Sequence, residues 1–423
     1  MKLGEFVSGV VERFSTSYTS GTTVSSASAA STPSNPIAMA VESLNGKYKT
    51  AWADNYEYVK FGNSDDVPEI LDKMKLQSPT HSGILNKKSK MMSGNKLIYQ
   101  ETKIKSGEKA RFNAFYKYCG GETKGVRSFV IDFSNSYQTY GAVPILLKFN
   151  KSGRLVTMKV LPVNSVRASL PNTSGVVDSY IVRRTFQRRA INEPDNKPRK
   201  VSAYRRNNTA TEQLLYIVNP YSGNPIYGLP NYLSAYYFIS SDYEFGRHIE
   251  NSVKNGFTPK VLASMIGRNM TEEQKEVEYD HFKNSFTGND ADSFILSWVK
   301  KKEDAPDFKV LDVANLDRTI DVLARLNDAK ILTAHSVTSP TLFGIQVAGK
   351  LGGTGTEMVT AYDTFRATET LPDREVMMTA LNDIMAISGY GEVDFEIEDI
   401  NITPNGANGL HDPEVAVSEN STL

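Results

Sequence analysis

Apolar positions recur at two spacings along residues 46–228 and predict an α+β unit built on an antiparallel sheet. Apolar side chains fall at helical spacing in residues 67–76 and 83–92. Four further apolar runs are bounded by turn residues, which is typical of strands. These runs are residues 96–103, 126–133, 142–148 and 155–161. Turn signals such as residues 150–153 (Asn-Lys-Ser-Gly) separate them.

A β-hairpin is predicted within residues 177–218, where strands at 179–188 and 201–204 flank a turn that contains two prolines. The hairpin is unusually basic. Its cationic residues are Arg183, Arg184, Arg188, Arg189, Lys197, Arg199, Lys200, Arg205 and Arg206. Such charge indicates either a contact with DNA or an acidic protein, or a solvated edge hairpin that resists aggregation. The sequence leaves both interpretations open.

Two long helices are predicted in the second half of the chain. The first spans residues 229–255, and at about 1.5 Å per residue it would be roughly 40 Å long. Its aromatic stripe favours packing against neighbouring elements over a ligand cage. The second helix spans residues 313–333. Its apolar positions, expected to face inward, are Leu316, Ile320, Leu323, Leu326 and Ile331.

The other face of the second helix alternates in charge through Arg318, Asp321, Arg325 and Asp328. This pattern is typical of a solvated surface with salt bridges, and repeated around a ring it would link one subunit to the next.

A small module, residues 256–312, separates the two helices. Strands are predicted at 260–266 and 294–299, and a helix at 271–286. The spacing of Thr271 and Gln274 is that of a capping box at the start of this helix. Two long helices that flank a small module predict two adjacent rods that carry a knob.

The two ends of the chain differ from its centre. Residues 1–45 are predicted to be a flexible arm with one short amphipathic helix. The apolar face of that helix is formed by Leu3, Phe6, Val7, Val10 and Phe14. It either docks into a groove on a partner or folds back onto its own domain. Residues 401–423 are predicted to be a disordered tail.

Residues 334–400 return from the second helix in three parts. Residues 334–360 contain a glycine-rich segment that favours a mobile loop. Its glycines are Gly349, Gly352, Gly353 and Gly355. Within residues 361–400 we expect a helix, broken near Pro372, and then an alternating edge strand.

Composition excludes several function classes. The chain has 48 basic and 48 acidic residues, so no net charge draws it to nucleic acid or to an anionic membrane. A single cysteine, Cys119, rules out an intramolecular disulfide and a multi-cysteine metal site. The sequence predicts neither a signal peptide nor a membrane-spanning helix, and we expect a soluble, intracellular protein.

Residue patterns for catalysis were sought without success, so we expect no enzyme activity, cofactor or metal. The glycine-rich segment lacks the Lys-Ser/Thr pair of a phosphate-binding loop. The five histidines are scattered and form no metal-binding or nucleophile–base pattern. Asp394, Glu396 and Glu398 lie on one face of the last strand, as nuclease metal ligands can. The wet face of an edge strand explains them as well.

Several short motifs, in their order and spacing, resemble the portal proteins of tailed bacteriophages, and particularly those of phages that infect Bacteroidetes-type hosts. The motifs include Trp52 and residues 58–63 (Tyr-Val-Lys-Phe-Gly-Asn), 67–71, 77–86, 227–232 (Tyr-Gly-Leu-Pro-Asn-Tyr), 255–259, 271–274, 286–288, 297–298 and 334–345. They are spread across residues 46–387.

The resemblance implies a portal fold with a wing, a two-helix stem, an inserted α/β clip and a tunnel loop, in a subunit with a reduced crown. The parts would be the wing at 46–228, stem helices at 229–255 and 313–333, the clip at 256–312, the tunnel-loop region at 334–360 and the wing return at 361–400. The basic hairpin fits this family pattern poorly.

The family forms rings, usually dodecamers, that pass double-stranded DNA into and out of the capsid. The resemblance therefore implies contacts with the terminase, then with head–tail adaptors, and with the major capsid protein, in a virion assembled in the host cytoplasm. Candidates for phosphate contact in such a channel are Lys254, Arg318, Arg325, Lys330 and Lys350. Ordinary surface charge at subunit contacts explains these residues equally well. The alternatives are a metal-dependent nuclease and another virion ring, such as a tail adaptor.

Overall fold

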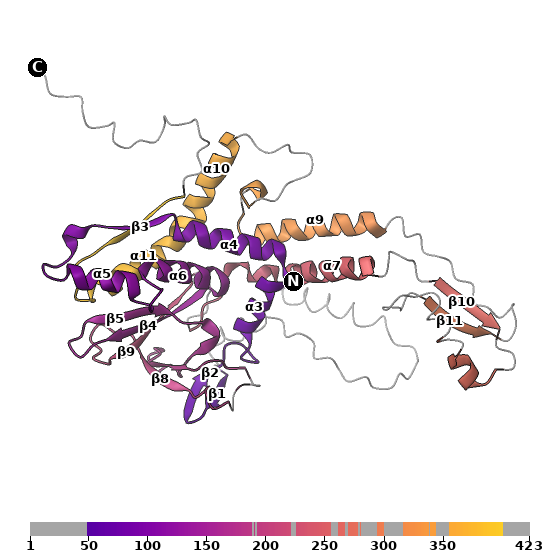
Figure 1. The fold of residues 1–423 in the computed structure, drawn as a ribbon, viewed down its shortest axis with the longest axis horizontal. Helices are drawn as coiled ribbons and strands as arrows, with labels where there is room; N and C mark the ends of the chain where they lie inside the picture. Colours follow the sequence, from indigo (N-terminus) through magenta and orange to yellow (C-terminus); the bar gives the residue numbers. More distant parts are fainter. Residues whose placement is uncertain are drawn as a thin grey trace, which may run out of the picture.

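A six-stranded mixed sheet forms the centre of the body of this computed structural model (Figure 1). The structure describes residues 49–187, 190, 193–220, 226–254, 261–266, 270–277, 280, 294–299, 316–337, 339–343 and 355–400. The strand order is β5-β4-β9-β8-β7-β6, and every neighbouring pair is antiparallel except β8 and β9. The strands are β4 (Ala142–Phe149), β5 (Leu155–Val160), β6 (Val166–Ala168), β7 (Ser179–Val182), β8 (Arg199–Ala203) and β9 (Glu212–Val218).

Helices cover both faces of this sheet. Successive side chains of a strand point to opposite faces, so Leu146 joins one hydrophobic cluster while Ile145 and Leu147 join the other. The first cluster includes residues of α3 (Val67–Gln77) and α4 (Pro79–Ser93). The helices of the second cluster are α5 (Lys109–Tyr118), α6 (Val126–Tyr140) and α11 (Leu371–Ala386). Burial on two faces explains why β4 is a nearly continuous apolar run.

The prediction of a strand at residues 126–133 is wrong, because this segment is the first half of α6. Val126, Phe129, Val130 and Phe133 are all buried, and their spacing is that of one helical face. Their β-branched and aromatic side chains had favoured a strand. The helix ends at Gly141, whose φ of +65° is a backbone conformation that glycine adopts without strain.

The strand predicted at 96–103 is shorter than expected, because β3 (Lys96–Tyr99) gives way to a 3₁₀ turn. The helices expected at 67–76 and 83–92 are confirmed as α3 and α4. Ser78 explains why α4 begins earlier than predicted, since its hydroxyl accepts a hydrogen bond from the His81 N–H at 3.1 Å and caps the helix.

The basic hairpin forms, with β7 and β8 antiparallel, but it does not lie at the edge of the sheet. β8 also pairs with β9, and β7 with β6, so the interpretation as an edge hairpin is wrong. Most of its described arginines meet carboxylates of the same chain: Arg184 pairs with Glu193 and Asp195, Arg199 with Glu212, Arg205 with Asp178 and Arg206 with Asp383. Arg183 is buried beside Phe186, and Arg188 and Arg189 lie outside the described residues.

The C-terminal part of the body begins with α10 (Gly355–Phe365) and reaches α11 through a π-helical turn, Arg366–Thr370. The break predicted near Pro372 is therefore a widened helical turn just before the proline rather than an interruption. The last strand is confirmed as β12 (Phe395–Glu398), antiparallel to β3 in a separate two-stranded sheet. None of the helices that the structure describes is long and apolar enough to cross a lipid bilayer.

Candidate functional site

Two helices extend side by side from the body: α7 (Tyr236–Lys254) and α9 (Leu316–Ala334) (Figure 1). Each has 19 residues. At 1.5 Å per residue each is about 28 Å long. The helices are antiparallel, and the buried amide of Asn327 donates a hydrogen bond to the Phe238 carbonyl at 2.9 Å. The second predicted helix has these bounds to within about a turn. The first begins later than predicted, because a 3₁₀ turn, Asn231–Ala235, follows Pro230.

A pair of parallel strands lies beyond the outer ends of α7 and α9 (Figure 1). They are β10 (Val261–Ile266) and β11 (Phe294–Val299), at the two positions where strands were predicted. The capping box is also confirmed. The Thr271 N–H donates to the Gln274 side-chain oxygen at 3.0 Å, and the Gln274 N–H donates to the Thr271 hydroxyl at 3.3 Å. The chain thus leaves the body along one helix, forms the strand pair and returns along the other.

The surface of α9 carries exposed apolar side chains. Val322 is 58% exposed and Leu326 is 51% exposed, and Leu323 lies beside them. The prediction that Leu323 and Leu326 face inward is therefore wrong, whereas Ile331 is buried as expected. Helical spacing identifies an apolar stripe but not the surface that covers it. Apolar residues that adjoin one another on an exposed surface are the kind of surface that another protein can cover.

Asp328 was predicted to lie on the outer charged face of α9, but its side chain contacts the body instead. Its carboxylate accepts a hydrogen bond from the Thr80 hydroxyl at 2.8 Å, so it joins α9 to α4. Arg325 remains on the exposed surface of the helix.

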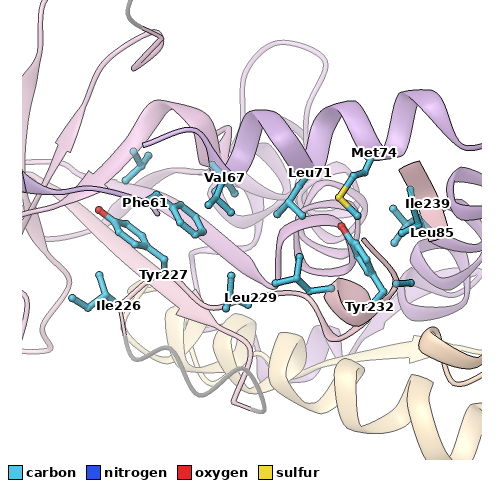
Figure 2. Packing of buried hydrophobic residues seen from close by; sticks show 14 of the residues in the cluster. Phe61, Val67, Leu71, Met74, Leu85, Ile226, Tyr227, Leu229, Tyr232 and Ile239 are labelled. Atoms are coloured by element: carbon cyan, nitrogen blue, oxygen red, sulfur yellow. The ribbon is translucent and has the colours of Figure 1, made fainter. Parts of the chain in front are cut away.

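The inner ends of α7 and α9 enter the body through a buried joint. Here a ring nitrogen of His81 on α4 lies 2.8 Å from a ring nitrogen of His335, directly after α9. The ring of Tyr232 stacks on His335 and meets the edge of His81. Figure 2 shows Tyr232 beside Met74, Leu85 and Ile239, within the apolar cluster at the base of the two helices. His335 is thus a packed residue of this cluster.

Both imidazoles of the joint are held neutral. Burial, with the nearby charge of Lys75, lowers the pKa of His81 to about 3. Burial, together with His81 and Lys88, holds the pKa of His335 well below its usual range. In a pair of neutral imidazoles one ring nitrogen donates and the other accepts, so the contact is an ordinary hydrogen bond. Protonation of either ring would place a positive charge in this buried joint, which the loss of hydration disfavours.

Two further polar contacts tie the joint to the rest of the body. The Ser78 hydroxyl, which caps α4, donates to the Asp242 carboxylate of α7 at 2.6 Å. The buried Lys88 ammonium lies 3.4 Å from the Glu369 carboxylate in the π-helical turn and 3.5 Å from the His335 carbonyl. Lys88 thereby connects the end of α9 with the segment that precedes α11. Both flanks of the glycine-rich region are anchored to the same helix, α4.

The structure describes the side chains of only some of the candidate channel cations. Arg325 and Lys330 lie on the exposed surface of α9. Lys254 and Arg318 belong to α7 and α9, but their side chains lie outside what the structure describes. Lys350 lies outside the described residues.

Of the predicted tunnel-loop glycines, Gly355 is the first residue of α10, and Gly349, Gly352 and Gly353 lie outside the described residues. The predicted docking helix, with Leu3, Phe6, Val7, Val10 and Phe14, lies outside them too.

The described part of the chain contains no candidate metal site. No group of three or more histidine, cysteine, aspartate or glutamate residues is placed to hold an ion there. The suggested nuclease carboxylates lie along or just before β12, where Glu398 is 3.9 Å from the Lys96 ammonium. These carboxylates are therefore polar residues of a short two-stranded sheet.

The thiol of Cys119 should be unreactive in the folded protein. It is 1% exposed, and burial raises its pKa to about 12. Because the thiolate is the reactive form, we expect a maleimide to label Cys119 more than about 100-fold faster in the denatured protein than in the folded protein. Mass spectrometry of labelled protein with and without urea measures this. Fast labelling in buffer would contradict the buried position.

The fold of this chain is similar to that of chains in several solved structures. The chain is similar to a chain in the virion of a native gene transfer agent particle, with a TM-score of 0.50 and 12% identity over 85% of this chain and 89% of that chain. Weaker likenesses are a chain in the neck of a native particle of the same kind, computed with C12 symmetry (TM-score 0.49, 13% identity, 85% and 89% covered), and an HK97-family phage portal protein from Corynebacterium diphtheriae (TM-score 0.44, 9% identity, 77% and 93% covered).

No protein-family model and no curated protein sequence matches the chain. At 12% identity the first structural likeness shows the fold alone, a mixed arrangement of helix and sheet that is shared with a chain of the gene transfer agent virion.

Proposed function

We propose that this chain is the subunit of a portal ring, through which double-stranded DNA enters and leaves the capsid of a tailed-phage-type particle. In this proposal the α+β body is the wing, α7 and α9 are the stem, and residues 256–312 form the clip. Residues 334–360 carry the tunnel loop, and the crown is reduced. The motifs described above and the fold shared with a gene transfer agent virion support this assignment.

The observation that carries the proposal is the exposed apolar stripe on α9, residues Val322, Leu323 and Leu326. This stripe lies on one of two rods that project from the body. A surface of this kind that meets a different surface on the next copy generates a closed ring when the rotation between copies closes. We propose a ring of twelve copies.

The charge balance of the whole chain suits passage of DNA rather than tight binding. The chain has no net charge, so DNA that slides past meets no overall attraction. Arg325 and Lys330 are our proposed transient phosphate contacts on α9, and Lys254, Arg318 and Lys350 complete the candidate set. Point charges of this kind position DNA without reading its sequence.

The partners follow from the same assignment. We propose that the clip contacts the terminase during packaging and the head–tail adaptors afterwards, and that the body contacts the major capsid protein. Assembly in the host cytoplasm and a Bacteroidetes-type host belong to the same proposal and rest on the sequence resemblance alone. Docking of the short helix within residues 1–45 is proposed from its apolar face.

Negative-stain imaging of the purified protein tests the proposal. We expect closed rings with a central hole, most of them twelvefold. Monomers or open filaments at micromolar concentration would overturn it, and cleavage of DNA that depends on a metal ion would favour a nuclease instead.

Charge placed on the apolar stripe should block ring formation. In the double variant Val322→Glu and Leu326→Glu, each new carboxylate would lose its hydration in a subunit contact, at a cost of about 2 kcal/mol or more per contact. Summed over a closed ring, this predicts monomers by light scattering. Val156→Glu on β5 is the matched control, an exposed apolar side chain on the body, and its rings should persist. Rings of normal size from the double variant would exclude this stripe as a subunit contact.

A further inference from the structure

A second site lies at one end of the six-stranded sheet, in the body rather than at the rods. A cavity of about 300 Å³ opens between the β4–β5 turn, the loop that joins β8 to β9, and the residue that follows α11, Ile387. None of the contacts described above for the rods or their joint involves these residues. The cavity is defined here as the basic pocket.

The two loops that form the basic pocket are held in place by internal hydrogen bonds. The buried Gln213 amide donates to the carbonyls of Asn208 and Ala210, both at 3.0 Å. In the β4–β5 turn the Asn150 side-chain oxygen accepts from the N–H groups of Ser152 at 3.0 Å and Arg154 at 2.9 Å. Side-chain contacts of this kind stabilise turns locally. The basic pocket is therefore formed in advance, which lowers the entropy cost of binding.

The lining of the basic pocket is cationic. Among the described residues that line it are Lys151, Arg205 and Arg206, and none of them is acidic. Arg205 and Arg206 each meet one carboxylate outside the lining, Asp178 at 2.8 Å and Asp383 at 3.4 Å. Among the described residues no carboxylate pairs with Lys151. Within the part of the chain that the structure describes, the Lys151 ammonium therefore has no counter-charge.

The charge of the lining favours an anionic ligand. An anionic group in the basic pocket would neutralise the Lys151 ammonium, and the guanidinium groups of Arg205 and Arg206 belong to the same lining. A carboxylate is an anion that pairs with both kinds of cation.

We propose that the basic pocket binds the acidic segment at residues 412–419 of this same chain. Residues 401–423 contain Asp412, Glu414 and Glu419 and no lysine or arginine. A carboxylate against an ammonium and a guanidinium forms charge-assisted hydrogen bonds, which are shorter and stronger than neutral ones. This proposal is independent of the portal assignment.

The length of the chain places the acidic segment within reach. Ile387 lines the basic pocket, and Ile400 is the last described residue. Thirteen residues separate the two, so they lie at most about 45 Å apart. The fourteen residues from 401 to 414 span up to about 50 Å when extended. Glu414 can therefore reach the basic pocket of its own chain wherever Ile400 lies relative to it.

Carbodiimide cross-linking of the full chain, followed by peptide mass spectrometry, tests this proposal. The reagent joins amines to carboxylates that already touch, so we expect Lys151 to be linked to Asp412, Glu414 or Glu419. The ion pair between Lys148 and Glu212, at 2.5 Å, provides an internal reference link in the same digest. A digest with the reference link but none between Lys151 and residues 412–419 would overturn the proposal.

A substitution separates binding in the basic pocket from chance contact of a tethered segment. Arg206→Gln removes one charge-assisted hydrogen bond and should lower the yield of the Lys151 link about tenfold. The matched control is Lys200→Gln, which removes an exposed cation of β8 outside the basic pocket and should leave the yield unchanged. An equal reference link in both variants shows that the fold is kept. If Arg206→Gln leaves the yield unchanged, the acidic segment does not bind here.

Discussion

Replacing Arg167 with methionine should lower the free energy of unfolding by about 3–5 kcal/mol, because it leaves a buried carboxylate without its counter-charge. The Arg167 side chain is fully buried, and its Nε lies 2.6 Å from the Asp65 carboxylate. It also donates to the carbonyls of Asp65 and Val166 and lies over the ring of Phe186. Urea unfolding followed by circular dichroism measures the loss.

Two further variants show whether the buried charge is the cause. The pair of Lys124 and Asp132 is exposed, so Lys124→Met should cost less than about 1 kcal/mol. Adding Asp65→Asn to Arg167→Met removes the unpaired charge and should restore about 1–2 kcal/mol. Asparagine tolerates the positive φ of residue 65. Equal losses for Arg167→Met and Lys124→Met would contradict the importance of this ion pair.

Acid should loosen the joint at the base of α7 and α9. His81 and His335 have lowered pKa values in the folded chain, so below about pH 6.5 the unfolded chain binds more protons and the folded state loses stability. The loss begins near pH 6.5 and, for His81, continues down to about pH 3. Between pH 7 and pH 5 each histidine should remove about 2 kcal/mol from the free energy of unfolding. Urea titrations at the two pH values measure this.

The matched comparison uses histidines of different exposure. The double variant His81→Gln and His335→Gln has no imidazole to protonate in the joint, so its stability should change between pH 7 and pH 5 by about 4 kcal/mol less than that of the wild type. His248 is exposed on α7, and His248→Gln should keep the full pH dependence. If the double variant and the wild type respond equally to pH, the joint is not the acid-sensitive element.

The sequence predicted elements best where one periodicity dominated. The helix at 313–333 and the strands at 260–266 and 294–299 were found close to their predicted bounds, because turn residues and an apolar stripe agree there. The prediction of a strand at residues 126–133 was wrong because β-branched and aromatic residues, which favour strands, lie there at helical spacing. Composition and periodicity disagree in α6, and there the segment forms a helix because this buries its apolar face.

The joint could not be predicted, because its parts are far apart in the sequence. His81 and His335 are separated by 254 positions and meet only because α9 returns to the start of α4. Likewise, periodicity gave no means to decide whether Leu326 packs against the body or faces outward, since both produce the same stripe. The basic hairpin shows a third limit. A run of arginines indicates charge, but ion pairs such as that of Arg205 with Asp178 depend on the tertiary fold.

The antiparallel course of α7 and α9 has an evolutionary consequence. The chain enters and leaves the segment that contains β10 and β11 at two neighbouring helix ends (Figure 1). A replacement of different length or sequence can be grafted between those ends without altering how the helices pack on each other or on the body. We therefore expect related chains to differ more in this tip than in the two helices and the body beneath it.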